Sequence, residues 1–337
     1  MKVSGSLIAK LSSAPQAIGK IEALGYNAAF SAEINGDPFL PLLLAAEHSK
    51  NIDLMTAISV AFARNPMTMA NLAHDLNNYS QGRFILGMGS QIQAHIEKRF
   101  SMPWSKPAAR MKEFVQAMRA IWASWYEGER LNFRGEFYRH TLMTPIFVPS
   151  ERDYGAPRVH IAGVGPLMTE VAGEVADGMI AHGFTTAKYL REVSLPAIAK
   201  GLAISGRARS DFVISCPVMI VSGDEEQKFI ANREVIKQQL AFYASTPAYR
   251  SVLEVHGWGD LQPILNGLSK EGKWHEMGEY ITDEILSTFA IVAEPKDIPV
   301  QLKERYGDLI DVWMCTYAMD TDDEQAKFIG EIQAQVV

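Results

Sequence analysis

Short apolar runs alternate with helical stretches along almost the whole chain, and this alternation constrains the fold more than any other feature. Eight runs are predicted to be strands: Val3 to Ala9, Ala28 to Ser31, Asp53 to Ile58, Phe84 to Met88, Val159 to Ile161, Gly178 to Ile180, Phe212 to Val221 and Asp311 to Cys315. A strand, a helix and the next strand form the unit of a parallel sheet. Eight such units in 337 residues predict an α/β fold, a (β/α)8 TIM barrel.

Apolar residues spaced three and four apart predict the intervening helices. These span Ala14 to Leu24, Leu40 to Lys50, Met67 to Asn78, Ala108 to Trp125, Leu167 to Ala176, Thr185 to Gly201 and Glu225 to Ala244. Two segments, 127–157 and 249–280, exceed what a minimal barrel needs and are predicted insertions that form lids or substrate walls. An oligomer interface is an equal alternative for the second insertion. No repeat or low-complexity linker divides the chain, so 1–337 is predicted to be one domain.

Composition excludes several classes of function. With 47% hydrophobic and 21% charged residues and a net charge of −7, the chain lacks the basic footprint of a nucleic-acid binder. No apolar run is long enough for a membrane span, and the apolar start is too short for a signal peptide, so a cytoplasmic protein is expected. No HExxH motif occurs, and Cys216 and Cys315 are too few for a structural zinc site, so no metal is expected.

Two glycines bracket the end of one predicted strand, in the run from Ser80 to Ser90. Without a Cβ, Gly87 and Gly89 permit positive φ or a close approach to a bound group. Ligands of parallel α/β folds bind at this end of the strands. The alternative is an ordinary turn.

A second glycine pair follows the strand at Val159. Gly163 and Gly165 turn the chain, and Pro166 is preset for the first turn of a helix. Free amides and the helix dipole favour a phosphate there, although such a turn also merely starts a helix. Neither glycine pair has the third glycine of a dinucleotide fingerprint, and no P-loop lysine follows.

Four runs together resemble the luciferase-like monooxygenase superfamily, and more narrowly its actinobacterial branch of deazaflavin-dependent oxidoreductases: Thr56 to Pro66, Ser80 to Gly89, Pro107 to Trp122 and Ala172 to Gly178. The resemblance covers almost the whole chain. It implies a TIM barrel that binds coenzyme F420 or, in other members, FMN. It also implies that the ring lies in the barrel mouth and that relatives often form homodimers.

The resemblance assigns cofactor-binding residues one by one. It implies a cis peptide bond between Ala57 and Ile58 against the ring, with Ser59 following. Ser90 and Gln91 are expected at the ring or its ribityl chain. The phosphate is expected at the turn that comprises Ala162, Gly163, Val164, Gly165, Pro166 and Leu167.

Two residues are candidates for catalysis, Glu33 from the resemblance and His95 from its helical spacing to Arg99. Glu33 falls where relatives place a polar or acidic residue near the reactive edge of the ring. It is predicted to hydrogen-bond the deazaflavin or to donate a proton, with a helix-capping or loop carboxylate as the alternative. His95 is a candidate proton shuttle that faces the pocket. The alternative is that it lies on a solvated helix face. His182 ends the sixth strand, where it either meets the ligand or is a structural histidine. Ile92 and Gln93 replace the carboxylate of some deazaflavin dehydrogenases, which argues against a sugar-phosphate dehydrogenase.

The leading prediction is an F420-dependent oxidoreductase that transfers a hydride between the deazaflavin C5 and a small organic substrate. An FMN-dependent monooxygenase fed by a separate reductase is the second interpretation. A flavin-binding barrel without enzymatic activity is the third.

Overall fold

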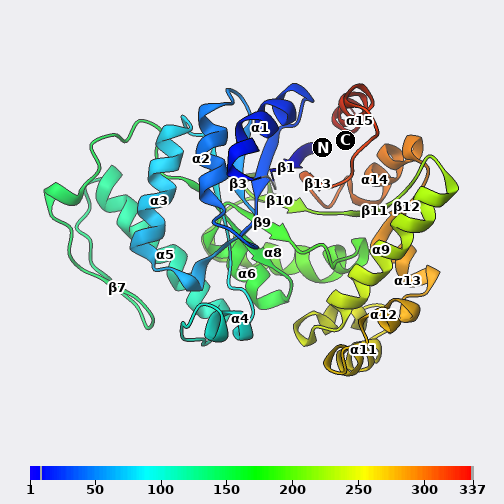
Figure 1. Ribbon diagram of the computed structural model, residues 1–337. Helices are drawn as coiled ribbons and strands as arrows, with labels where there is room; N and C mark the ends of the chain where they lie inside the picture. The colour runs from blue at the N-terminus through cyan, green and yellow to red at the C-terminus, as the bar shows by residue number, and fades with distance from the viewer. Residues whose placement is uncertain (8–9, 335–337) are drawn as a thin grey trace.

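The computed structural model describes residues 1–7 and 10–334, and within them eight parallel strands close into a barrel (Figure 1). These are β1 (Lys2–Ser6), β2 (Ala28–Ser31), β3 (Asp53–Thr56), β5 (Phe84–Gly89), β8 (Arg158–Gly163), β9 (Gly178–Ala181), β10 (Val213–Cys216) and β13 (Val312–Cys315). Their order is β3-β2-β1-β13-β10-β9-β8-β5, and pairing of β3 with β5 closes the ring. The predicted TIM barrel is therefore confirmed.

Helices surround the barrel, including three that the sequence analysis did not predict, at 93–98, 298–306 and 322–334 (Figure 1). They are α1 (Ala14–Ala23), α2 (Phe39–Glu47), α3 (Pro66–Tyr79), α4 (Gln93–Lys98), α5 (Pro107–Tyr126), α6 (Pro166–Val175), α7 (Ala187–Tyr189), α8 (Leu195–Ser205), α14 (Ile298–Tyr306) and α15 (Asp322–Ala334). A π-helical turn, Leu190–Ser194, interrupts the helix predicted over Thr185 to Gly201. Among the described residues, no helix has the length and apolar character that crossing a membrane requires.

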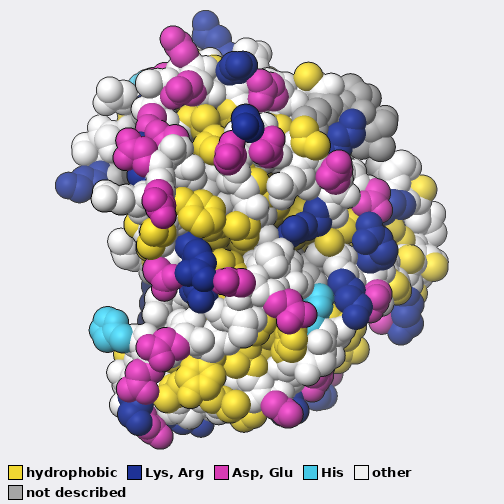
Figure 2. Space-filling view, turned by 90° about the vertical axis from the view of Figure 1, so that its right-hand side faces the viewer, with side chains coloured by type: hydrophobic (Ala, Val, Ile, Leu, Met, Phe, Trp, Pro, Cys, Tyr) yellow, Lys and Arg dark blue, Asp and Glu magenta, His cyan; other side chains and the backbone are white. Residues whose placement is uncertain are grey.

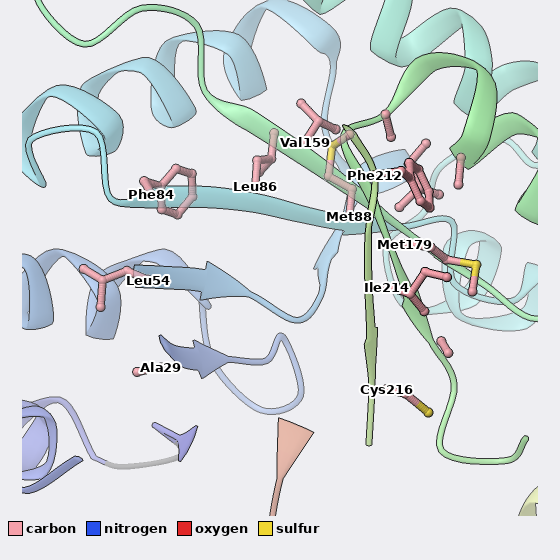
Figure 3. Packing of buried hydrophobic residues seen from close by; sticks show 14 of the residues in the cluster. Ala29, Leu54, Phe84, Leu86, Met88, Val159, Met179, Phe212, Ile214 and Cys216 are labelled. Carbon is pink, nitrogen blue, oxygen red and sulfur yellow. The ribbon is translucent and has the colours of Figure 1, made fainter. Parts of the chain in front are cut away.

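Alternate side chains of the strands form two apolar layers. Outward-facing residues such as Leu54, Leu86 and Met179 pack in the larger core between strands and helices (Figure 3). Inside the barrel lies a smaller cluster, which consists of Phe30, Met55, Ile85, Ile180 and Met314. This second layer forms the floor on which a ligand in the barrel mouth would rest.

One predicted strand is divided in the structure, and part of another lies outside the described residues. The prediction over Phe212 to Val221 was wrong, because the run divides at Pro217, which has no backbone N–H to continue the ladder. Its second half, β11 (Met219–Val221), leaves the barrel and pairs with β12 (Ala290–Val292), which the sequence analysis missed. The first strand ends at Ser6 among the described residues, and the rest of its prediction, positions 8–9, lies outside them.

The insertion at 127–157 forms the projecting hairpin at the left of Figure 1. Its short strands β6 (Phe133–Arg134) and β7 (Arg139–His140) pair antiparallel. Glu113 on α5 holds the turn, because its carboxylate accepts hydrogen bonds from the amides of Glu136, Phe137 and Tyr138 at 2.6–2.8 Å.

The insertion at 249–280 is helical and packs on α9 (Glu226–Ala244), at the right of Figure 1. It contains α10 (Arg250–Glu254), α11 (Leu261–Lys270) and α12 (Trp274–Met277), and α13 (Asp283–Phe289) follows it. These helices share an apolar core with Phe184 and Tyr189. The count of one domain stays a prediction.

An extra residue in the third strand creates a bulge at the barrel mouth. Met55 pairs with Ile85 but Ser59 pairs with Met88, so β3 and its continuation β4 (Ser59–Val60) contain one residue more than β5 over this stretch. The peptide bond between Ala57 and Ile58 is cis, as the resemblance implied. Gly87 faces the bulge, since a Cβ there would lie 1.8 Å from the Thr56 carbonyl oxygen.

Gly87 and Gly89 therefore serve the bulge, and neither adopts the positive φ that the sequence allowed. A Cβ on Gly89 would lie 2.8 Å from Ile58 Cδ1. The hydroxyl of Thr56 accepts a hydrogen bond from the Gly87 amide at 2.9 Å and donates one to the Gly87 carbonyl at 2.8 Å. The close approach that glycine permits is between two strands.

We predict that Gly87→Ala destabilises the fold by about 3 kcal/mol, because the methyl group overlaps the backbone of β3 and Ile180. Urea unfolding measures this change. Gly19→Ala in α1 is the matched control, because no atom lies within 4 Å of its Cβ position, and it should stabilise by about 0.5–1 kcal/mol. Equal stability of the two variants would contradict the assignment.

Candidate active site

A chamber of about 1920 Å³ opens at the carboxyl ends of the barrel strands. Its floor includes Phe30, Ile180 and Met314 of the inner apolar cluster. Ten of the predicted cofactor-binding residues line it: Ala57, Ile58, Ser90, Gln91, Ala162, Gly163, Val164, Gly165, Pro166 and Leu167. Segments predicted separately for the ring and for the phosphate thus share one cavity.

The turn after β8 has an open side toward this chamber. Gly165 is the N-cap of α6, and Pro166 begins the helix. No atom lies within 4 Å of the position that a Gly165 Cβ would take. The hydroxyl of Tyr189 donates a hydrogen bond to the Val164 carbonyl at 3.1 Å, which fixes the turn from behind. An anion can therefore reach the first amides of α6.

Ser59 is the one predicted cofactor-binding residue that does not line the chamber. Its hydroxyl is buried and donates to the Gly87 carbonyl at 3.2 Å, within the bulge. Gln91 has a left-handed backbone, with φ of 59°, at the chamber edge. Contact of any of these residues with a cofactor stays a prediction.

Glu33 does not line the chamber but forms hydrogen bonds with residues of the bulge. Its backbone amide donates to the Ile58 carbonyl at 3.1 Å, and its carboxylate accepts from the Val60 amide at 2.7 Å. Arg64 completes an ion pair with it at 2.6 Å, and the Glu33 side chain is only 7% exposed. Glu33 thus bonds two residues of the bulge, Ile58 through its backbone amide and Val60 through its carboxylate, whose predicted proton transfer stays untested.

His95 lies on the exposed face of α4 and does not line the chamber. The neighbouring Arg99 donates to the Ile34 carbonyl at 2.7 Å instead of facing a ligand. The catalytic role of His95 stays a prediction, for which this placement gives no geometric support.

His182, at the end of β9, does line the chamber. Its Nδ1 accepts a hydrogen bond from the Phe184 amide at 3.0 Å, so the neutral ring carries its proton on Nε2. The rings of Tyr243 and Tyr249 pack against it at centroid distances of 4.7 and 4.6 Å. Burial lowers the pKa of His182 to about 4, which keeps the ring neutral near pH 7.

One wall of the chamber was missed in the sequence. Asn232, Ile236, Gln239 and Tyr243 of α9 line it, and Tyr249 of the insertion stands beside them. Their spacing of four, three and four places them on one helix face, which is a signal that the sequence carries. It was overlooked because polar side chains on a helix ordinarily face solvent.

No group of three or more His, Cys, Asp or Glu side chains within 1–7 and 10–334 is arranged to hold a metal ion. Cys216 and Cys315 are buried, and burial raises the pKa of each thiol to about 12. Both thiols are unreactive under ordinary conditions.

A barrel whose third strand bulges into a chamber shared with a glycine turn defines the luciferase-like class of TIM barrels. The family model of the luciferase-like monooxygenases matches residues 3–312, so the chain belongs to this family.

Individual relatives agree with this assignment. An uncharacterized protein of Mycobacterium tuberculosis is 52% identical over 311 residues, which cover 92% of each chain. A 5,10-methylenetetrahydromethanopterin reductase of Archaeoglobus fulgidus is 27% identical over 276 residues, 80% of this chain and 78% of the relative. The solved structure of the coenzyme F420 dependent tetrahydromethanopterin reductase of Methanopyrus kandleri superposes with a TM-score of 0.78, at 19% identity, over 98% of this chain and 96% of that one.

We predict that Glu33→Gln destabilises the protein by about 3 kcal/mol, because it leaves the half-buried Arg64 without its main partner. Asp37→Asn is the control, since Asp37 bonds the same guanidinium at 3.2 Å from an exposed position and should cost less than about 1 kcal/mol. Urea unfolding compares the two variants. An unchanged stability of Glu33→Gln would show that the bulge does not depend on this pair.

We predict an acid-dependent loss of stability that includes a contribution from His182. Between its ordinary pKa of 6.5 and about 4, the unfolded chain binds the proton and the folded chain does not, so stability falls as pH falls through this window. The full effect is about 3 kcal/mol for one such group. Unfolding measured across the window should show a flatter pH dependence in His182→Gln than in the unsubstituted protein.

Proposed function

We propose that the protein is an F420-dependent oxidoreductase that transfers a hydride between the deazaflavin and a small organic substrate. The observation that carries the proposal is the single chamber that joins the bulge of the third strand to the open turn before α6. Membership of the luciferase-like family and likeness to the methanopterin reductases support it.

The residues present fit such a cofactor. Ala57 and Ile58 provide an apolar support at the floor, and Ser90 and Gln91 offer polar groups at the edge of the chamber. The amides after Gly165 suit the phosphate. When bound, the deazaflavin supplies hydride chemistry, and the protein aligns substrate and ring while excluding water.

His182 is the group that we propose to contact the substrate oxygen. It lines the chamber, and its protonated nitrogen is Nε2 because Nδ1 is already an acceptor. Nε2–H is thus available to donate a hydrogen bond to a carbonyl or hydroxyl oxygen. The two tyrosine rings against it limit its rotation. Its role is to orient and polarise the oxygen, since the ring remains neutral.

Parallel calorimetric titrations of the apo-protein with F420 and FMN test the proposal. Binding of F420 alone supports it, whereas preference for FMN would assign the chain to the oxygen-using monooxygenases of its family. Binding of both without turnover of any substrate would favour a flavin-carrying barrel. Binding of neither would refute the proposal.

We predict that Gly165→Val weakens cofactor binding at least tenfold, because the new side chain occupies the open side of the turn where the phosphate must approach. Stability should change little, since nothing lies within 4 Å of the Cβ. Gly36→Val, which also has an open Cβ position but lies outside the chamber, is the control. Unchanged affinity in Gly165→Val would remove the phosphate from this turn.

A further inference from the structure

Charge is distributed unevenly around the chamber. Every Lys, Arg, Asp and Glu among its described lining residues comes from α4, α5, α6 or the residue preceding α5: Glu97, Lys98, Lys106, Lys112, Glu170 and Glu174. Lys106, Lys112 and Glu170 are each engaged in ion pairs of 2.5–2.8 Å. The described lining residues of β9, β11, β13, α9 and the segments 217–218 and 246–249 include no such group. The half of the chamber beside α9 therefore offers no cation to a phosphate or carboxylate.

That uncharged half is not wholly apolar. Asn232, Gln239 and Tyr243 lie along one face of α9, with Ile236 between them. The outermost and innermost of these residues are separated by about 16 Å along the helix axis. Gln239 Nε2 donates to the Tyr243 hydroxyl at 3.2 Å, which orients that pair and leaves the Gln239 amide oxygen available. The wall thus combines neutral hydrogen-bonding groups with the apolar side chain of Ile236.

Asn232, one of these lining residues, has a hydrogen-bond acceptor without a donor among the described residues. Its Oδ1 is buried and has no partner among the described residues, although the residue lines the chamber. A buried amide oxygen without a donor costs about 1–3 kcal/mol, and a turn of the amide about χ2 toward the chamber would let a ligand donor recover this cost. Few such atoms are tolerated without a reason in a folded protein.

We propose that the α9 wall is the specificity-determining subsite for an elongated, uncharged substrate that carries hydrogen-bonding groups at both ends. This inference rests on the proposed function for the identity of the reaction, but not for the binding of the ligand. One end, a carbonyl or hydroxyl, meets His182 Nε2 at the barrel mouth. The other end, an amide or similar neutral donor, meets Asn232, while the body lies on Ile236 and the Tyr243 ring. Phosphorylated and carboxylated substrates are rejected because nothing on this wall compensates their desolvation.

Two matched probes test the proposal. Both are biphenyl rods with an acetyl group at one para end, and the other end carries a carboxamide in the amide rod and a carboxylate in the acid rod. Calorimetric titration of the cofactor-loaded protein should show at least tenfold tighter binding of the amide rod. Asn232→Leu should weaken the amide rod about tenfold, which corresponds to one lost hydrogen bond. Asn232→Lys should reverse the preference in favour of the acid rod.

Gln227→Leu is the matched control, because Gln227 is an exposed amide on the same helix and does not line the chamber. It should leave both affinities unchanged, and circular dichroism should confirm that every variant folds. Equal binding of the two rods, binding of neither, or a preference that both Asn232 substitutions leave unchanged would overturn the inference. Since the readout is binding, the same titrations can be made on the apo-protein if the cofactor titration fails, so the two proposals fail separately.

Discussion

The extra residue in the third strand is the constraint on which the mouth of this barrel depends. A bulge that carries Ala57 and Ile58 into the chamber requires room beneath it and a restraint on both sides. Gly87 supplies the room, because any Cβ would overlap the Thr56 carbonyl. Glu33 supplies the restraint through the Ile58 carbonyl, the Val60 amide and Arg64. The shape of the proposed ring site thus depends partly on residues that do not line the chamber themselves, such as Glu33 and Gly87.

This dependence explains which parts of the molecule the sequence could reveal. The barrel itself follows from local pattern, since eight apolar runs separated by helical periodicity leave few alternatives. The turn at Gly163 to Leu167 could also be predicted, because its glycine and proline residues indicate the backbone conformation directly. The function of Gly87, in contrast, could not be predicted from the sequence. A glycine at a strand end indicates a close approach, and only the strand register shows that the approaching group is β3 and not a ligand.

Glu33 and the α9 wall illustrate the same limit from two sides. Glu33 is an acid near a predicted site, and sequence alone does not distinguish a proton donor from a carboxylate that accepts from the Val60 amide and pairs with Arg64. Asn232 and Gln239 are amides on a helix whose sequence has no clear apolar face. Which way these amides point depends on how the long insertion places α9. The face toward the viewer in Figure 2, on the right-hand side of Figure 1, shows positive and negative side chains interspersed. Overall charge therefore says little about a chamber whose charges lie on one side only.

One half of the chamber suits a cofactor and the other half suits a substrate, whatever the identity of that substrate. The half built by the bulge, β5 and the turn before α6 consists largely of backbone and small residues, which suits a cofactor shared across a family. The half built by α9 and residues 246–249 consists of side chains that lie outside the barrel strands, where substitutions alter specificity without disturbing the barrel. His182 stands where the halves meet, fixed by Phe184 and two tyrosine rings of the insertion side. A substrate that lies along α9 would therefore also present its oxygen to the Nε2–H of His182.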